Sequence, residues 1–492
     1  MPYTYHMANL LLAVLSCVLF FASQFDGLLF FCFLPAFLLL LYLIQKEASL
    51  ARLVLYAALI GTSAHAGAFF WVWTTYPVPW LGETPLFLQA LGIGIYWLIS
   101  SFVMGLGTVA FAAVMRPLMR MRGAIIVLTA PLLWVGSELL RSLLFSVYQI
   151  APETTFNFDM GMGYIGNVLA QSPLLHQAAA FGGVYILSYI AVLLAVLVYV
   201  PLSSRRYYAA GIAVFSAAVL LFIPFPYAVH TTSPVHRSVI AVTTQFGHVA
   251  ASDDEMLRRQ GDGLKQAVAL AIRLDPDAVV LPEGAGLTGR FASTDEVLAF
   301  IKDANPLFQG VVVDSHALKD ERGQFVLRAF IYDMKDQTVY NYDKTYLVPL
   351  GEYMPYFYRG VLSLFLSDAA MDSIYGMVRQ KPGLLRGDDA PSEVPKILFC
   401  FEDLKPYGVR TAPGSGGASF VAHPISHSWF TRPFTLWYQI DASVSTQAIW
   451  GGLPVVSAGN MAPSKLYLPN GSIENGDTLQ KADLWSLERF TF

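Results

Sequence analysis

Charged side chains are scarce in this sequence. Asp, Glu, Lys and Arg make up 13% of the 492 residues and hydrophobic residues make up 55%, whereas an ordinary soluble domain carries roughly 25% charged residues. Much of the chain is therefore expected to lie in lipid. Long basic runs are also lacking and the formal net charge is only -4, so the composition gives no reason to expect a nucleic-acid partner. Together these deficits predict a membrane protein.

The long apolar runs lie within the first 228 residues, and most are close to the ~20 residues that span a bilayer. The first run is the shortest, and we interpret it as a retained segment that either spans or re-enters the membrane. The pattern predicts a transmembrane domain at 1–228 and a water-facing domain at 229–492. Seven spans are predicted, near residues 8–22, 27–44, 53–73, 87–115, 123–145, 178–202 and 207–228.

Basic residues occur in only one set of the loops between these spans. The alternate loops contain neither Lys nor Arg. Because basic loops tend to remain in the cytoplasm, the N-terminus is predicted to be cytoplasmic and the domain at 229–492 to lie on the outer face. The basic loop residues are Lys46, Arg52, Arg116, Arg120, Arg122, Arg205 and Arg206.

The chain after residue 228 changes to short β-rich runs separated by turn residues, with helical patterns at 254–274 and 430–448. This alternation predicts an α/β layered domain. Its single cysteine is Cys400, because Cys17 and Cys32 fall within predicted spans, so no disulfide can form within the domain. A lone cysteine is by itself more often a small buried residue than a nucleophile.

Three chemically active side chains follow predicted strands directly. Glu283 comes after "DAVVL", Lys344 after "TVYNYD" and Cys400 after "VPKILF", and the ends of strands are where α/β sheets keep their ligands. A thiol and a carboxylic acid differ by about 4 pKa units, or roughly 6 kcal/mol against proton transfer. Burial of the carboxyl and an ammonium beside the thiol would narrow that gap, and the ammonium could also stabilise an oxyanion.

Glu352 follows Lys344 within the run "YDKTYLVPLGEYMPY". We interpret it as the carboxylate that keeps the lysine charged and oriented. A surface Lys–Glu pair beside a hairpin is the alternative that the residues leave open.

The segments "VVLPEGA", "YDKTYLVPLGEYMPY" and "ILFCFED" resemble, in order and spacing, the Glu, Lys, Cys triad of the nitrilase superfamily. The middle segment is similar to a signature of the apolipoprotein N-acyltransferases, and "LLWVGSELLR" resembles that family's Trp, Glu, Arg helix end. The resemblance implies a multi-pass α-helical membrane domain in the bacterial inner membrane and a periplasmic nitrilase-like domain, an αββα sandwich. It implies these roles: Glu283 as base, Lys344 as oxyanion stabiliser, Cys400 as nucleophile, Glu352 and Glu402 as supports, and Glu138, Arg141 and Phe401 as substrate-binding candidates.

The reaction that this resemblance implies is a ping-pong acyl transfer. A phospholipid, with phosphatidylethanolamine as the expected donor, would acylate Cys400, and the N-terminal amine of a diacylglyceryl-cysteine lipoprotein would accept the chain. No cofactor motif is present. Two alternatives remain: a membrane-anchored amidase with the same triad, and a catalytically lapsed paralogue that binds lipoproteins.

Several residues also have plainer interpretations. Glu138 and Arg141 are three positions apart and are expected to pair with each other rather than bind a headgroup, and His65 is expected to pack between helices. His423 and His427 lack a third ligand at a telling distance, so a zinc site is not expected. The segment 353–371 is either an apolar arm that dips toward the bilayer or a core helix.

The chain departs from the family pattern in several places. Leu281 stands where the family has Trp before Pro-Glu, and "SHSWF" stands for the family's Asn-Asp-Ala-Trp-Phe. A last transmembrane helix after the nitrilase domain is absent, since the chain stops at "WSLERFTF". These changes leave the proposed triad intact but bear on substrate fit.

Overall fold

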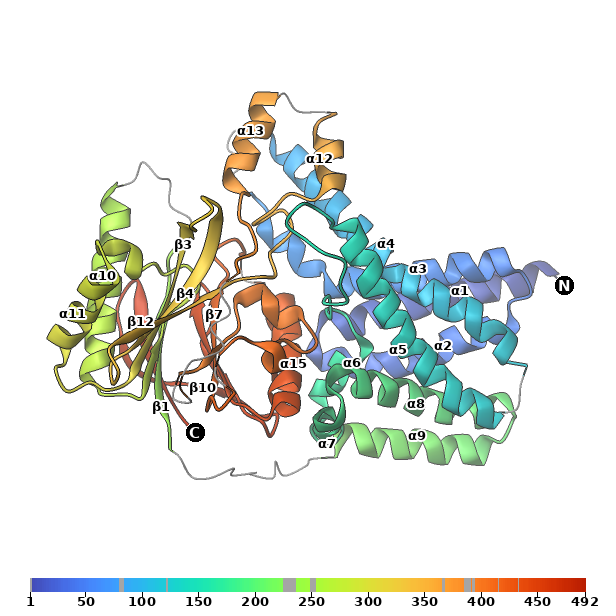
Figure 1. Cartoon of the computed structure of the whole chain (residues 1–492). Coiled ribbons are helices and arrows are strands. Elements are labelled where there is room, and N and C mark those ends of the chain that lie inside the picture. The colour runs from blue at the N-terminus through green and yellow to red at the C-terminus, as the bar shows by residue number, and fades with distance from the viewer. Residues whose placement is uncertain are drawn as a thin grey trace.

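The chain forms a bundle of long helices beside an α/β domain (Figure 1). The computed structural model describes residues 2–78, 84–120, 123–223, 236–247, 254–364, 368–384, 391, 394–414, 416–431 and 433–492. The predicted domain boundary between residues 228 and 229 lies outside these ranges.

Six helical segments within the described ranges are long and apolar enough to cross a membrane. They match the first six predicted spans. The seventh predicted span corresponds to α9 (Tyr207–Phe222), an apolar helix of 16 residues. The first span is one continuous helix. The six are α1 (Pro2–Phe25), the segment Gly27–Lys46 that contains α2 (Phe33–Lys46), α3 (Leu50–Ala68), α4 (Leu86–Leu118), α5 (Gly123–Tyr148) and α8 (Gly183–Ser203).

Small residues bring α3 and α4 into close contact. A Cβ atom added at Gly61 would lie 2.5 Å from the carbonyl oxygen of Gly105, and one at Gly105 would lie 2.6 Å from the backbone nitrogen of Thr62. Close backbone approach of this kind is how helices associate in lipid, where apolar side chains gain nothing from leaving water.

The segment between α5 and α8 contains only short helices. These are α6 (Ile165–Val168) and α7 (Pro173–His176), in keeping with the irregular loop expected from the sequence. Figure 1 shows this segment at the end of the bundle that faces the α/β domain.

The α/β domain has its strands in two packed halves that join where Thr244 of β1 pairs with Asn460 of β8. One half contains β1 (Ser238–Thr244), β2 (Ala278–Val280), β3 (Val311–Lys319), β4 (Phe325–Asp333), β5 (Thr338–Asp343), β11 (Asp477–Lys481) and β12 (Trp485–Thr491). The other contains β6 (Lys396–Ile397), β7 (Val421–Ser426), β8 (Val455–Asn460), β9 (Lys465–Tyr467) and β10 (Ile473–Asn475).

Three apolar cores separate four layers. The first lies between the first half of the strands and the helices α10 (Asp254–Arg273) and α11 (Thr294–Ala304). In the second, Val313 of the first half and Ala422 and Val456 of the second half belong to one cluster. Alternate residues of the same strands, Val421 and Val455, belong to a third cluster with α15 (Phe434–Gly451), as expected for the two-residue period of a strand. The layers are therefore helix, sheet, sheet, helix, the predicted αββα sandwich.

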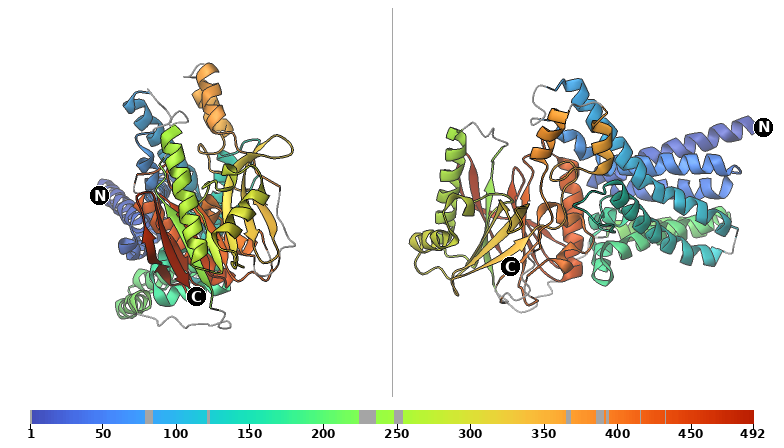
Figure 2. Two further views of the ribbon diagram at one scale, coloured as in Figure 1. Left: turned by 90° about the vertical axis from the view of Figure 1, so that its left-hand side faces the viewer. Right: turned by 45° about the horizontal axis from the view of Figure 1, so that its top comes forward.

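Helix α15 lies between the sheet and the membrane bundle, as Figure 1 and the right-hand view of Figure 2 show. The side-chain amide of Gln439 donates to the carbonyl oxygen of Gln24 at 2.8 Å, and Thr446 is hydrogen-bonded to His176 at 3.1 Å. The α/β domain thus rests on one end of the bundle through buried polar contacts as well as apolar packing.

The segment expected to be an arm or a core helix contains α12 (Tyr356–Leu362) and the start of α13 (Asp368–Met377). Figure 1 shows both helices standing beside α4, away from the core of the α/β domain. Tyr358 of α12 packs against the rings of Tyr96 and Tyr148, with ring centroids 5.6 Å apart in both pairs. The arrangement therefore favours an arm over a core helix. Residues 365–367 of this segment lie outside the described ranges.

Candidate active site

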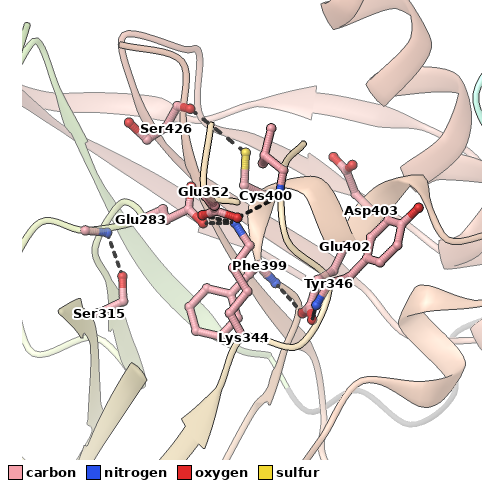
Figure 3. A network of polar contacts seen from close by, with 12 residues as sticks. Glu283, Ser315, Lys344, Tyr346, Glu352, Phe399, Cys400, Glu402, Asp403 and Ser426 are labelled. Carbon is pink, nitrogen blue, oxygen red and sulfur yellow. Dashed lines mark hydrogen bonds and ion pairs between the residues drawn. The ribbon is translucent and has the colours of Figure 1, made fainter. Parts of the chain in front are cut away.

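Three neighbouring segments bring the predicted triad together (Figure 3). Glu283 lies in the loop after β2, Lys344 directly follows β5, and Cys400 begins the short 3-10 helix η7 (Cys400–Leu404) after β6. Each side chain follows a strand, as the sequence predicted, so the sheet fixes all three backbones.

Lys344 is the centre of the cluster. Its Nζ donates to Oε1 of Glu283 and to Oε1 of Glu352, both at 2.8 Å, and its side chain is fully buried. The other carboxylate oxygen of Glu352 accepts a hydrogen bond from the backbone N–H of Val348 at 2.8 Å. The surface-pair alternative is therefore wrong, and a buried ammonium with two carboxylate partners takes its place.

Glu402 ties the turn that carries Cys400 to the loop that carries Lys344. Its Oε1 accepts hydrogen bonds from the backbone N–H of Thr345 at 3.0 Å, from the Thr345 hydroxyl at 2.9 Å and from the backbone N–H of Tyr346 at 3.2 Å. Its Oε2 accepts from the backbone N–H of Phe399 at 3.2 Å. The carboxylate is thus satisfied by fixed donors and acts as a clamp between two loops.

The Cys400 thiol donates to the carbonyl oxygen of Ser426 at a sulfur–oxygen distance of 3.9 Å, and Glu283 is close enough for its charge to act on the thiol. Burial raises the pKa of Cys400 well above its usual value, and the charge of Glu283 raises it further. Lys344 lowers this pKa, as expected from the sequence, but burial outweighs it. The resting sulfur is therefore a thiol, which must give up its proton when it reacts.

Glu283 is suited to accept that proton. Burial raises the pKa of its carboxyl, the charge of Lys344 lowers it, and the charge of Glu352 raises it again, with a net upward direction. A higher pKa makes a carboxylate a stronger base toward a thiol. The sequence predicted this direction for Glu283.

Two side chains from β3 hold the loop of Glu283. The hydroxyl of Ser315 accepts a hydrogen bond from the backbone N–H of Gly284 at 2.8 Å, and Oδ2 of Asp314 accepts from both the backbone N–H and the hydroxyl of Thr288 at 2.7 Å. Gly284 has φ +67°, a left-handed conformation that favours glycine.

A loop of the membrane domain holds the turn after the nucleophile. The backbone N–H of Gly161 donates to the carbonyl oxygen of Leu404, the last residue of η7, at 2.9 Å. Asp159 accepts a hydrogen bond from the Tyr407 hydroxyl and lies 4.0 Å from Nζ of Lys405. The position of Cys400 therefore depends on the membrane domain as well as on its own sheet.

Replacing Gly161 with alanine tests this dependence. The new Cβ would lie 2.8 Å from the carbonyl oxygen of Leu404 and 3.0 Å from Pro406, so the turn must shift at a cost of about 1–3 kcal/mol. We expect a lower unfolding temperature and altered alkylation of Cys400. Gly136→Ala is the matched control, because no heavy atom lies within 4 Å of its new Cβ. Equal behaviour of the two variants would contradict the inferred contact.

The remaining candidates occupy two places. Phe401 stacks on Tyr346 with ring centroids 5.2 Å apart, beside the nucleophile. Glu138 and Arg141 are buried inside the bundle, with 3.6 Å between their charged groups. Arg141 also contacts the ring of His65, whose Nε2 is 2.6 Å away. The expected Glu–Arg pairing is therefore present, and His65 contacts the same arginine.

The pair supports the loop that reaches the nucleophile turn. Oε1 of Glu138 accepts hydrogen bonds from the Trp134 indole N–H at 3.1 Å and from the backbone N–H of Ile165 at 2.8 Å.

Within the described ranges, no group of three or more His, Cys, Asp or Glu side chains is placed to hold a metal ion.

Several known proteins are similar to this chain in sequence. Residues 13–197 match the model of the apolipoprotein N-acyltransferase N-terminal domain. An apolipoprotein N-acyltransferase of Rickettsia typhi is 24% identical over 480 residues, covering 94% of this chain and 87% of the relative. The chain is thus similar to apolipoprotein N-acyltransferases over most of its length. A second such relative, from Geobacter metallireducens, is 26% identical over 435 residues, covering 84% of this chain and 76% of that protein.

Solved structures of an amidase and of a carbon-nitrogen hydrolase are similar to about half of the chain. An amidase from Nesterenkonia sp. covers 52% of the chain with 90% of its own length, at 14% identity and a TM-score of 0.35. A carbon-nitrogen hydrolase from Helicobacter pylori covers 51% with 88% of its length, at 16% identity and a TM-score of 0.34.

Several contacts of the site were not foreseen from the sequence. The Ser426 carbonyl that accepts the thiol hydrogen bond is a backbone group, and no sequence pattern points to it. Asp159 and Gly161 lie about 240 residues before the turn that they hold, so no local pattern connects them to it. The sequence did point to Asp403, because this residue continues the polar turn after Cys400. Its partner, His423, could not be identified without the fold.

Proposed function

We propose that this chain transfers an acyl chain from a phospholipid to the N-terminal amine of a diacylglyceryl-cysteine lipoprotein, through a thioester on Cys400. The observation that carries the proposal is the fully buried Lys344, whose Nζ lies 2.8 Å from a carboxylate oxygen of Glu283 and of Glu352, in the same cluster as the Cys400 thiol. The family name of the relatives and the six apolar helices support a lipid donor and a lipoprotein acceptor.

In the first half-reaction, Glu283 takes the thiol proton as the sulfur attacks the ester carbonyl of the phospholipid. The Lys344 ammonium stabilises the oxyanion of the tetrahedral intermediate. The carbon–oxygen ester bond then breaks, and the protonated Glu283 gives its proton to the departing oxygen. The products are a lysophospholipid and a thioester on Cys400.

In the second half-reaction, the lipoprotein amine attacks the thioester carbonyl while Glu283 accepts a proton from the amine nitrogen. The carbon–sulfur bond breaks, an amide forms, and the proton returns to the sulfur. Glu352 keeps Lys344 in place through both steps, and Glu402 holds the nucleophile turn. All proton transfers use side chains of the chain itself.

Topology follows from the loop charges. With basic loops in the cytoplasm, the N-terminus is cytoplasmic, and with α9 as the seventh crossing the α/β domain meets the outer leaflet of the inner membrane from the periplasm. Helix α12 then contacts α4 through Tyr358 and Tyr96, and the N-terminal part of α4 also carries Phe87 and Leu91, which are 69% and 56% exposed. We assign contact with the acyl donor to Phe401, which lies beside Cys400. For Glu138 and Arg141, complete burial favours mutual pairing over headgroup binding.

Intact-mass analysis after exposure to phosphatidylethanolamine tests the proposal. The full chain in detergent should gain one acyl group on Cys400 and release lysophospholipid, and addition of a diacylated lipopeptide should remove the acyl group as triacylated product. Water should remove it far more slowly, since an acyltransferase must protect its thioester.

The rival functions predict different outcomes of the same experiment. An amidase, which shares the triad, gives no lipid-derived adduct but hydrolyses a soluble amide. A lapsed lipoprotein-binding paralogue, suggested by Leu281 and by the "SHSWF" segment, gives neither an adduct nor hydrolysis. Either result would overturn the acyl-transfer proposal.

A further inference from the structure

A buried acid–base pair lies directly behind the nucleophile. Asp403 is in the same 3-10 helix as Cys400, and its Oδ2 is 3.5 Å from Nε2 of His423 on β7. The two side chains are 2% and 0% exposed. Neither atom has a hydrogen-bond partner within the part of the chain that the structure describes, so each faces the other.

We propose that Asp403 and His423 are positioning residues that share one proton as a net-neutral pair, which anchors the nucleophile turn to β7 without placing an uncompensated negative charge beside the Cys400 sulfur. The inference rests on the proposed function, since it assumes that this sulfur must become a thiolate in the reaction.

The pair connects the two elements that handle the thiol. The helix η7 carries Cys400, and β7 ends with Ser426, whose carbonyl oxygen accepts the thiol hydrogen bond. The Asp403 carbonyl oxygen also accepts from Ser443 at 2.8 Å and from Gln447 at 2.6 Å, both on α15. Asp403 is therefore fixed from three elements, and a rigid turn holds the sulfur in place.

His423 is held on its other side. Its Nδ1 lies 2.6 Å from the hydroxyl of Ser457 on β8. A net-neutral pair requires a proton on Nδ1, which donates to the Ser457 hydroxyl. The shared proton then lies either on Nε2, giving an imidazolium beside a carboxylate, or on Asp403, giving a neutral ring beside a carboxylic acid. In both cases the pair has the same number of protons and no net charge.

The charges around the pair explain why neutrality matters. Burial raises the pKa of the Asp403 carboxyl, whereas His423 and Lys344 lower it and Glu402 raises it. Asp403 also faces Cys400 and Tyr467, and His423 faces His427. A negative Asp403 raises the pKa of the Cys400 thiol. Two carboxylates, Glu283 and Asp403, would then oppose formation of the thiolate, against the single favourable charge of the Lys344 ammonium among the groups that shift the Cys400 pKa.

Two substitutions separate charge from structure. His423→Gln removes the group that neutralises Asp403, so the thiol should titrate at higher pH, and alkylation by iodoacetamide at a fixed pH below the midpoint should slow about tenfold, which corresponds to one pKa unit. Asp403→Asn removes the negative charge, so the midpoint should stay or move to lower pH. The double variant should return the midpoint close to that of the parent chain.

The measurement uses the full chain in detergent over a pH series, with mass spectrometry to locate the adduct on Cys400. If the pair were merely structural, the pH midpoint of Cys400 alkylation would move in the same direction in both single variants. That result would overturn the proposal, and so would an unchanged midpoint in His423→Gln. If His423→Gln does not fold, the Asp403→Asn variant decides alone. A midpoint that moves to higher pH would overturn the proposal, and a midpoint that moves to lower pH or stays unchanged would support it. Alkylation needs no acyl donor, so failure of the proposed function would leave this readout intact.

Discussion

Replacing Cys400 with alanine should abolish both the acyl adduct and product formation, with a loss of at least about 1,000-fold in rate. The sulfur is the only atom in the proposed mechanism that carries the acyl chain, and no neighbouring side chain can replace it as a nucleophile. The fold should persist, because the substitution removes only one sulfur atom and the helix η7 is held by Glu402 and by Gly161. Intact-mass analysis and a lipopeptide acylation assay measure the two losses.

Cys17→Ala is the matched control for this variant. Cys17 lies on α1 in the membrane bundle, far along the chain from the site, so this variant should still form the adduct. If Cys400→Ala restored growth to cells that lack the native acyltransferase, covalent catalysis would not be the role of the chain. The lapsed, lipoprotein-binding alternative would then be the better account.

The sequence indicated the site because its signals are local. Glu283, Lys344 and Cys400 each follow a run of strand residues, and the change from apolar to polar at such a point can be read without knowledge of the partners. The two long helices α10 and α15 agree with the helical patterns at 254–274 and 430–448 within a few residues, because each has an apolar side that packs on a sheet.

Properties that depend on the whole fold could not be predicted in the same way. The sequence suggested that Lys344 would lower the pKa of the Cys400 thiol, but burial has the larger effect, and burial is set by every segment around the sulfur. Asp403 and His423 are 20 positions apart by their residue numbers and meet only because η7 packs against β7.

Replacing Lys344 with methionine should have the second large effect, on stability and activity together. The ammonium is fully buried and bonded to Glu283 and Glu352. Removing one partner of a buried ion pair leaves uncompensated charge and typically costs about 3–5 kcal/mol. Loss of an oxyanion-stabilising group costs about 100- to 1,000-fold in rate. Heat unfolding in detergent and the rate of thioester formation report the two effects.

A second substitution separates these two effects. In the double variant with Lys344→Met and Glu352→Gln, one of the stranded carboxylates is removed, so part of the stability should return while the rate stays low. Full recovery of the rate would contradict a direct role for the ammonium. Lys344→Arg keeps the charge but not the compact geometry of the amine, so it should be more stable than Lys344→Met yet still slow.

The pH dependence of the Lys344→Met variant gives a further check on how the lysine acts. In the parent chain, Lys344 lowers the pKa of Glu283 against the effect of burial. Without it the pKa of Glu283 should rise further, so a larger fraction of this base is protonated at neutral pH and cannot accept the thiol proton. Raising the pH should therefore recover the part of the rate lost through the base, whereas the part lost through the oxyanion should not return. A variant whose rate returned completely at high pH would show that Lys344 serves only to keep Glu283 ionised.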